Sequence, residues 1–234
     1  MSTDIVQYPG VFVTGTDTEI GKTFCSCLLM EALQQRGLKV AGMKPVASGG
    51  ELRDGRLVNE DALQLQQQSG MNHPYDWVNP YVFEPPIAPH LAASQAGHRI
   101  ERQPIVEAYA QLQEHSDQVI VEGVGGWRVP LSDSLSVSDL PGLLGLPVVL
   151  VVGMRLGCLN HALLTIESIE QQNVSVVGWI ANGIDPGFAA QQGNLQTLES
   201  RLSVPCLAQI PYQPVSLTPQ QQAQLATGIN ISWL

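Results

Sequence analysis

The feature that most constrains the fold of this chain is a series of short, β-rich apolar runs separated by segments of helical periodicity. The runs are Val11 to Thr14, Val40 to Val46, Gln118 to Val121, Pro147 to Val152, Val176 to Ala181 and Cys206 to Ile210. Most are apolar on both faces, as parallel strands covered by helices on both sides must be. The alternation predicts an α/β fold with a doubly wound, mainly parallel sheet and helices on both faces.

The segment from Lys22 to Arg36 carries apolar residues at the three-four spacing of one helix face, and Gly37 supplies a stop signal. Further helices are predicted at Asn59 to Ser69, Glu101 to His115, Asn160 to Gln172 and Gln191 to Leu202. The stretch from Met71 to Pro89 has no clear period and is predicted to be an ordered loop. In such a fold, ligands bind at the carboxyl ends of the strands.

Length, charge and composition limit the kinds of function that this chain can have. The chain has 234 residues and a net charge of -10, so we expect a single domain over residues 1–234 with a short N-terminal tail at 1–9. An acidic chain without a clustered basic surface is a poor partner for nucleic acid or an anionic membrane. No signal peptide or long apolar run is visible, and the four scattered cysteines are expected to be buried, reduced thiols, so a cytoplasmic location is predicted.

The strongest motif is Gly15-Thr-Asp-Thr-Glu-Ile-Gly21-Lys22-Thr23, between the first strand and the first helix. In a P-loop, glycines bring backbone N–H groups close to phosphate, the helix N-terminus adds positive potential, the lysine reaches the terminal phosphates and the hydroxyl ligates Mg²⁺. The motif therefore predicts a P-loop NTPase type of fold that binds ATP with Mg²⁺.

The motif departs from the usual pattern in its length. Five residues separate Gly15 from Gly21, where the usual number is four, and Thr16 stands where the first glycine would be. The other interpretation is a glycine-containing turn with a chance lysine. The strand before it and the amphipathic helix after it disfavour that interpretation.

Two further strand ends carry charged groups. Glu122 follows an apolar strand and leads into a glycine-rich turn, and it can ligate Mg²⁺ where many P-loop proteins use Asp. Lys44 closes the second predicted strand, and Ser48 follows in its loop. A second ammonium near the P-loop could stabilise a transferred phosphoryl group or hold an anionic substrate. The alternatives are a solvated glutamate and a surface lysine.

Together these segments resemble the dethiobiotin synthetases, the ATP-dependent ring-closing enzymes of biotin synthesis. The residues that carry the resemblance are Val13 to Thr23, Lys44 to Gly49, Asn79 to Tyr81, Ala88 to His90, Val121 to Trp127, Pro130 to Asp133, Val151 to Gly153, Leu156 to His161 and Ile210-Pro211. They run in order over nearly the whole chain. The family's P-loop has the same additional residue, so the unusual length supports the resemblance.

The resemblance implies a reaction and a set of site residues. The family converts 7,8-diaminopelargonate, CO₂ and ATP into dethiobiotin, ADP and phosphate through a phosphorylated carbamate. The resemblance implies that ATP is contacted by Glu19, Ile20, Gly21, Lys22, Thr23, Phe24, Asp61, Glu122, Gly123, Val124, Gly125, Asn182, Gly183, Pro211, Tyr212 and Gln213. It implies Mg²⁺ ligands at Thr23, Asp61 and Glu122, and catalytic roles for Lys22 and Lys44.

The substrate contacts implied by the resemblance are Thr18 and Ser48, together with Gly157 and Asn160 from the partner chain of a homodimer. Asp61 rests on the resemblance alone, because Asn59-Glu60-Asp61 reads equally well as the start of a helix. His90 and His161 receive no role, since an isolated histidine is more often a packed or capped residue.

Two rival functions stay open at this point. One is a P-loop switch ATPase of the partitioning or metal-insertion type, which commonly has an additional lysine near the start of the P-loop. This chain has Thr16, Asp17 and Thr18 there. The other is a synthetase-like regulatory module, which would lose Ser48 or the segment from Leu156 to Asn160, and both are intact.

Overall fold

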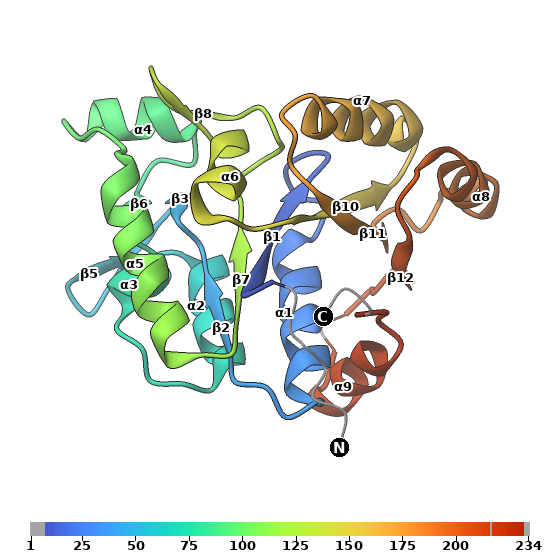
Figure 1. Ribbon diagram of the computed structural model, residues 1–234, viewed down its shortest axis with the longest axis horizontal. Helices are drawn as coiled ribbons and strands as arrows, with labels where there is room; N and C mark the ends of the chain where they lie inside the picture. The colour runs from blue at the N-terminus through green and yellow to red at the C-terminus, as the bar shows by residue number, and fades with distance from the viewer. Residues whose placement is uncertain (1–7, 216, 232–234) are drawn as a thin grey trace.

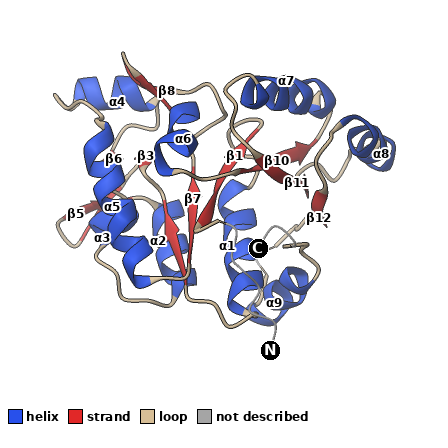
Figure 2. Ribbon diagram, viewed as in Figure 1, coloured by secondary structure: helices blue, strands red, loops and turns tan. Residues whose placement is uncertain are grey.

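A central sheet of six parallel strands organises the computed structural model, which describes residues 8–215 and 217–231 (Figures 1 and 2). Of the predicted tail at residues 1–9, residues 1–7 lie outside the described residues. The strand order is β12-β11-β10-β1-β7-β2. The strands are β1 (Gly10–Gly15), β2 (Val40–Met43), β7 (Gln118–Glu122), β10 (Val148–Met154), β11 (Val176–Gly183) and β12 (Cys206–Ile210).

The sheet winds in both directions from β1. Strands β7 and β2 lie on one side of β1, and β10, β11 and β12 lie on the other. All neighbouring pairs are parallel, so the carboxyl ends of the strands share one edge. The register places Val13 opposite Glu122 and Gly15 opposite Val151. The end of β1 therefore lies beside Glu122, at the point where the winding changes direction and ligands bind in such sheets.

The alternation of side chains along the strands forms a core on each face of the sheet. On β1, Val11 and Val13 pack against α1, α2 and α9, whereas Phe12 faces the helices on the other side. On that second face α5 and α6 cover one half, and α7 and α8 pack on β10 and β11 (Figure 1). The predicted doubly wound, mainly parallel sheet with helices on both faces is confirmed.

The helices are bounded by recognisable signals. The amide of Asn59 caps α2, accepting from the Ala62 N–H at 3.3 Å, and Gly70 ends that helix in the left-handed conformation. The helices are α1 (Lys22–Gln34), α2 (Glu60–Ser69), α3 (Tyr75–Val78), α4 (Pro89–Gln95), α5 (Arg102–His115), α6 (Leu140–Leu144), α7 (Cys158–Glu170), α8 (Gln191–Arg201) and α9 (Pro219–Thr227), with a 3-10 turn η1 at Val137–Asp139.

Two predictions at the level of elements are wrong. The run Val40 to Val46 is not one strand, because β2 ends at Met43 and β3 (Val46–Ser48) belongs to another small sheet. Pro45 has no N–H for the ladder, and the Lys44 N–H donates to the Val78 carbonyl at 2.7 Å.

The stretch Met71 to Pro89 is not a loop throughout, since it contains α3 and β6 (Tyr81–Phe83). Strand β6 pairs with β3, and the other small strands form two antiparallel pairs. These are β4 (Glu51–Arg53) with β5 (Arg56–Val58), and β8 (Pro130–Ser132) with β9 (Leu135–Ser136). Within the described ranges, no helix has the length and apolarity needed to cross a membrane.

Candidate active site

The loop between β1 and α1 is shaped by two glycines that no other residue could replace without movement. Gly21 precedes α1 with φ +79°, and a Cβ there would lie 2.3 Å from Asn182 Nδ2. A Cβ on Gly15 would meet the Lys22 side chain at 2.9 Å. The N-cap residue Gly21 has no side chain to cap the start of α1, so among the described residues the first N–H groups of this helix are available to an anion.

Lys22 lies at the head of α1 with a buried stem and an amine turned back to the loop. Its Nζ donates to the Asp17 carbonyl at 2.8 Å, while the Asp17 carboxylate pairs with Arg155. Burial, reinforced by the nearby charge of Lys44, lowers the pKa of the Lys22 amine to about 8. A phosphate in the loop would supply the negative charge that this partly desolvated amine lacks.

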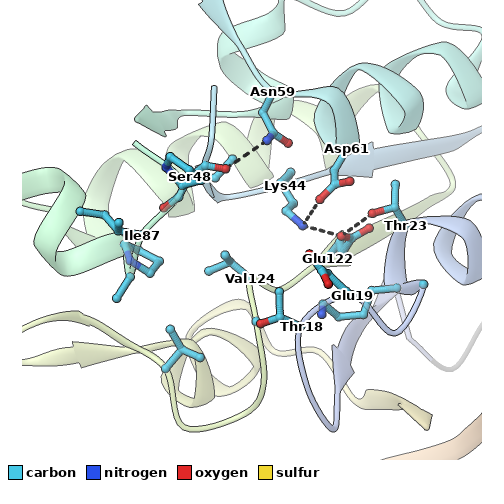
Figure 3. Close-up of a pocket in the computed structure, with 18 residues that line it drawn as sticks. Thr18, Glu19, Thr23, Lys44, Ser48, Asn59, Asp61, Ile87, Glu122 and Val124 are labelled. Carbon is cyan, nitrogen blue, oxygen red and sulfur yellow. Dashed lines mark hydrogen bonds and ion pairs between the residues drawn. The ribbon is translucent and has the colours of Figure 1, made fainter. Parts of the chain in front are cut away.

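Glu122, at the end of β7, is the centre of the charged cluster in Figure 3. It is 0% exposed, and its Oε1 accepts from Lys44 Nζ at 2.5 Å and from Thr23 Oγ1 at 2.9 Å. Its Oε2 is buried without a partner among the described residues. Burying a carboxylate oxygen without a partner raises the free energy of the folded protein, unless a cation or a hydrogen-bond donor contacts that oxygen. With the Thr23 hydroxyl beside it, this donor set fits a hard cation such as Mg²⁺.

Lys44 joins the two carboxylates of the cluster. Its Nζ also donates to Asp61 Oδ2 at 3.0 Å and to the Gly123 carbonyl at 3.2 Å. Burial opposes the charge of Lys44, but the carboxylates of Glu122 and Asp61 outweigh burial and raise its pKa. For Asp61, burial is outweighed in turn by Lys44, and the pKa of the carboxyl is lowered. Lys44 is therefore a fixed positive charge at the strand edge.

Around this cluster lies a cleft of about 830 Å³. The predicted residues that line it are Thr18, Glu19, Gly21, Lys22, Thr23, Lys44, Ser48, Asp61, Glu122, Val124 and Gly125. The Oγ of Ser48 is buried there and has no partner among the described residues. Sequence reasoning missed the other lining residues, which are Ala47, Asn59, Pro86, Ile87, Ala88, Pro89 and Val129.

A second pocket of about 660 Å³ continues from the first, since Glu19 and Gly21 line both. The predicted residues Phe24, Asn182, Gly183, Tyr212 and Gln213 line it, and Pro211 borders an adjacent hollow instead. Ile20 is buried, and its carbonyl accepts from Asn182 Nδ2 at 2.8 Å. This pocket adjoins the P-loop, and the aromatic rings of Phe24 and Tyr212 in its lining are flat surfaces of the kind on which a nucleotide base can stack.

The second pocket also has a wall that sequence reasoning missed. The missed lining residues are Gln64, Ile184, Pro214, Val215, Leu217 and Gln222. Gln222 belongs to α9, whose signal was available in the capping box formed by Thr218 and Gln221. Gly183 lines this pocket with its backbone, and a Cβ there would lie 2.7 Å from the Tyr212 nitrogen.

Within one chain, the predicted substrate contacts Gly157 and Asn160 are not among the residues that line the two pockets. Gly157 is the N-cap of α7 and Asn160 lies in its first turn, and neither lines the cleft or the second pocket. Beside them Leu156 is 89% exposed, and Leu164 on the same helix is 57% exposed. The start of α7 therefore presents apolar side chains to the outside of the chain.

Comparison with known proteins identifies the family. A family model described as an AAA domain matches residues 9–220. The ATP-dependent dethiobiotin synthetase BioD of Aromatoleum aromaticum is 49% identical over 220 residues, which are 94% of this chain and 96% of that protein. The enzyme of the same name from Xanthomonas oryzae is 48% identical over 89% of this chain and 93% of its own length.

Solved structures show a likeness of fold alone. The cell division protein MinD of Aquifex aeolicus matches with a TM-score of 0.54 at 13% identity, over 94% of this chain and 87% of that chain. A putative plasmid partition protein of Borrelia burgdorferi, bound to AMPPNP, matches with a TM-score of 0.54 at 11% identity, over 95% of this chain and 96% of its own.

The partitioning proteins thus share the chain fold without its sequence, whereas the synthetases share nearly half of its residues. Of the rival functions left open by the sequence, the synthetase is the one that the relatives support. The chain belongs to the family of ATP-dependent dethiobiotin synthetases, the ring-closing enzymes of biotin biosynthesis.

Proposed function

We propose that the cleft joins 7,8-diaminopelargonate, CO₂ and ATP into dethiobiotin through a phosphorylated carbamate, with ADP and phosphate as the other products. The observation that carries the proposal is the meeting of Lys44, Glu122 and Thr23 at the head of the P-loop helix. In that arrangement two lysines and two carboxylates surround the place where a terminal phosphate would lie. Positioning and charge stabilisation are the main contributions a protein makes to phosphoryl transfer.

The P-loop main chain and Lys22 hold the triphosphate, and the second pocket holds the base. Release of Lys22 Nζ from the Asp17 carbonyl, 2.8 Å away, frees the amine for the phosphate. The free N–H groups at the start of α1 face the same anion. Asn182 and the ring of Tyr212 contribute to the base pocket, with Gly183 and Gln213 beside them.

Thr23, Asp61 and Glu122 would hold Mg²⁺, as the unpaired Glu122 Oε2 and the adjacent hydroxyl favour. When bound, the ion would neutralise charge on the terminal phosphates. Lys44 is held between the Glu122 and Asp61 carboxylates, and its ammonium would lie next to the oxygens of the transferred phosphoryl group and stabilise their charge.

The proposed reaction has three steps, which are carbamate formation, phosphorylation of the carbamate and ring closure. One amine of the substrate attacks CO₂ and loses a proton, which gives a carbamate anion. A carbamate oxygen attacks the γ-phosphorus, and the bond from that phosphorus to ADP breaks. The second amine then attacks the carbamate carbon, phosphate leaves, and the remaining proton is released. Ser48 and Thr18, on opposite sides of the cleft in Figure 3, would orient the substrate.

The decisive experiment is ADP release by the purified protein with MgATP and bicarbonate, with and without the diamine. The proposal requires that the diamine stimulate ADP release and that a cyclic urea accumulate in equal amount. A Lys22→Ala variant should lose ATP binding by calorimetry. If the diamine leaves ADP release unchanged, the proposed reaction is wrong, and a Lys22→Ala variant with normal ATP affinity would refute the role of the P-loop.

The homodimer is part of the same proposal. Leu156 precedes Gly157 and Leu164 lies one turn after Asn160, and such large exposed apolar side chains favour an interface at this part of α7. A partner chain placed there would bring Gly157 and Asn160 to the opposite cleft. We also assign the reaction to the cytoplasm, where the four free cysteines would stay reduced.

Mixed dimers test the shared site. Lys44→Ala and Asn160→Ala proteins should each be nearly inactive alone. After unfolding and refolding together, the mixture should recover about a quarter of the wild-type activity, because each mixed dimer has one intact site. If the two residues act within the same chain, no activity returns on mixing.

A further inference from the structure

A buried polar chain from α3 connects the backbone of Lys44 with the start of α2. Asn79 is 1% exposed, and its Nδ2 donates to the Lys44 carbonyl at 2.6 Å and to the Tyr81 carbonyl at 3.1 Å. Its Oδ1 accepts from the Tyr75 hydroxyl at 2.9 Å. All the hydrogen-bonding groups of this amide except one lone pair are thus engaged within the protein.

The other end of the chain lies at α2. The Tyr75 hydroxyl accepts from the Asn59 N–H at 2.8 Å. The Asn59 side chain caps α2 through the Ala62 N–H and donates to the Ser48 carbonyl at 3.4 Å. Asp61 occupies the first turn of this capped helix. A single hydroxyl therefore joins the two segments that carry Lys44 and Asp61.

Lys44 depends on this chain because the sheet does not hold its backbone. Strand β2 ends one residue earlier, and the following proline has no N–H. The Lys44 N–H donates to the Val78 carbonyl at 2.7 Å, and the Lys44 carbonyl accepts from Asn79. Both polar groups of the Lys44 main chain are thus bonded to the segment at residues 78–79.

We propose that Tyr75 and Asn79 are positioning residues that set the place of the Lys44 amine relative to Asp61 and Glu122. This inference rests on the role of Lys44 in the proposed function. The two carboxylates come from different elements, and a short shift of the Lys44 main chain would lengthen both contacts, now 2.5 Å and 3.0 Å. Buried, satisfied networks of this kind hold reacting groups within the narrow tolerance that catalysis requires.

Tyr75→Phe tests the inference, because it removes one hydroxyl and keeps the ring. The change leaves the Asn59 N–H and the Asn79 Oδ1 without their partner. At saturating substrates and well below the melting temperature, kcat should fall about tenfold or more, while the KM for ATP changes less than about threefold. Equal kcat in the variant and the wild type would overturn the proposal.

Tyr109→Phe is the matched control. Tyr109 is also a buried tyrosine, but its hydroxyl has no partner among the described residues and lies in the core under α5. Removing that hydroxyl should leave kcat and KM within about twofold of the wild type, since no hydrogen bond is lost. A comparable loss of kcat in this control would mean that any buried hydroxyl matters and would remove the case for Tyr75.

A double-mutant cycle separates positioning from a general loss of stability. If Tyr75 acts through Lys44, Tyr75→Phe should have no further effect on the residual kcat of Lys44→Met. If the two losses multiply, Tyr75 does not act through Lys44. An Asn79→Asp variant, which loses both amide donors and keeps the shape, should repeat the fall in kcat and the coupling to Lys44.

A readout that needs no turnover distinguishes failure of this inference from failure of the proposed function. The chain has three lysines, Lys22, Lys39 and Lys44, so ¹³C-lysine NMR gives a short set of signals that single substitutions assign. In Tyr75→Phe the Lys44 Cε signal should shift or broaden, and the Lys39 signal should not. An unchanged Lys44 signal overturns the inference, even if the diamine-dependent reaction is present. A shifted signal in a protein without that reaction would sustain the inference and reject the proposed reaction alone.

Discussion

The P-loop and the Lys44 cluster hold charge by different means, although they share one edge of the sheet. The P-loop relies on main-chain geometry, with Gly21 in the left-handed conformation and the uncapped start of α1 facing the cleft. The Lys44 cluster relies on side chains from β7 and α2, the buried Glu122 and the partly exposed Asp61, that lie within hydrogen-bonding distance of Lys44. A site made of main chain is encoded locally, whereas a site made of side chains exists only after the sheet has formed.

This difference explains what the sequence could predict. The P-loop is visible as one run of residues, and the six apolar runs of the main sheet were located to within a few residues. The cluster is not visible in that way, because Lys44 and Glu122 are 78 residues apart in the chain. Asp61 could be assigned only through the family resemblance, since its sequence context is equally that of a helix start.

Two of the errors of sequence reasoning concern features that no local pattern displays. The end of β2 at Met43 depends on where the N–H of Lys44 finds its partner, and that partner is the Val78 carbonyl. The short helix α3, which contains Tyr75, has one turn and too few residues for a periodic signal. Helix α9 is different, because its capping box of Thr218 and Gln221 is a local signal that the sequence displays.

The largest effect is expected from a substitution in the Lys44 cluster. Glu122→Gln keeps the shape of the residue but removes the charge that faces Lys44 and the orphan oxygen that would hold Mg²⁺. We expect kcat to fall by about a hundredfold to a thousandfold. The Mg²⁺ concentration for half-maximal ADP release should rise, as a Mg²⁺ titration would measure. An unaltered Mg²⁺ dependence would take Glu122 out of the metal site.

A smaller effect is expected from Gly21→Ala, which strains the main chain of the P-loop. The new methyl group would press on Asn182 Nδ2 and break its bond to the Ile20 carbonyl. ATP affinity should fall by about tenfold or more, and thermal unfolding should show a loss of about 1–3 kcal/mol.

Gly70→Ala is the matched control for Gly21→Ala. Gly70 has φ +64°, similar to Gly21, but among the described residues no atom beyond its chain neighbours lies within 4 Å of the place of its Cβ. The control should therefore lose about 1 kcal/mol of stability through strain alone and keep its ATP affinity. If both variants bind ATP equally well, the close approach of Gly21 to Asn182 does not shape the nucleotide site.

The smallest effect concerns the wall of the base pocket. Tyr212 is 41% exposed and lines that pocket, so its ring can stack on one face of a base while the other face stays open. Tyr212→Ala should raise the KM for ATP about fivefold and leave kcat unchanged, whereas Tyr212→Trp should keep both values. Steady-state kinetics in ATP would check this split, and a fall in kcat in Tyr212→Ala would contradict a role limited to the base.

In the proposed reaction, the P-loop binds the nucleotide and the Lys44 cluster acts on the transferred phosphate. The most direct test is the dissociation constant for MgATP of Lys44→Met, measured by calorimetry on a protein in which only a small residual turnover is expected. We predict a value within about threefold of the wild type, because the P-loop contacts do not involve Lys44. Loss of ATP binding in parallel with turnover would contradict the division between the two regions.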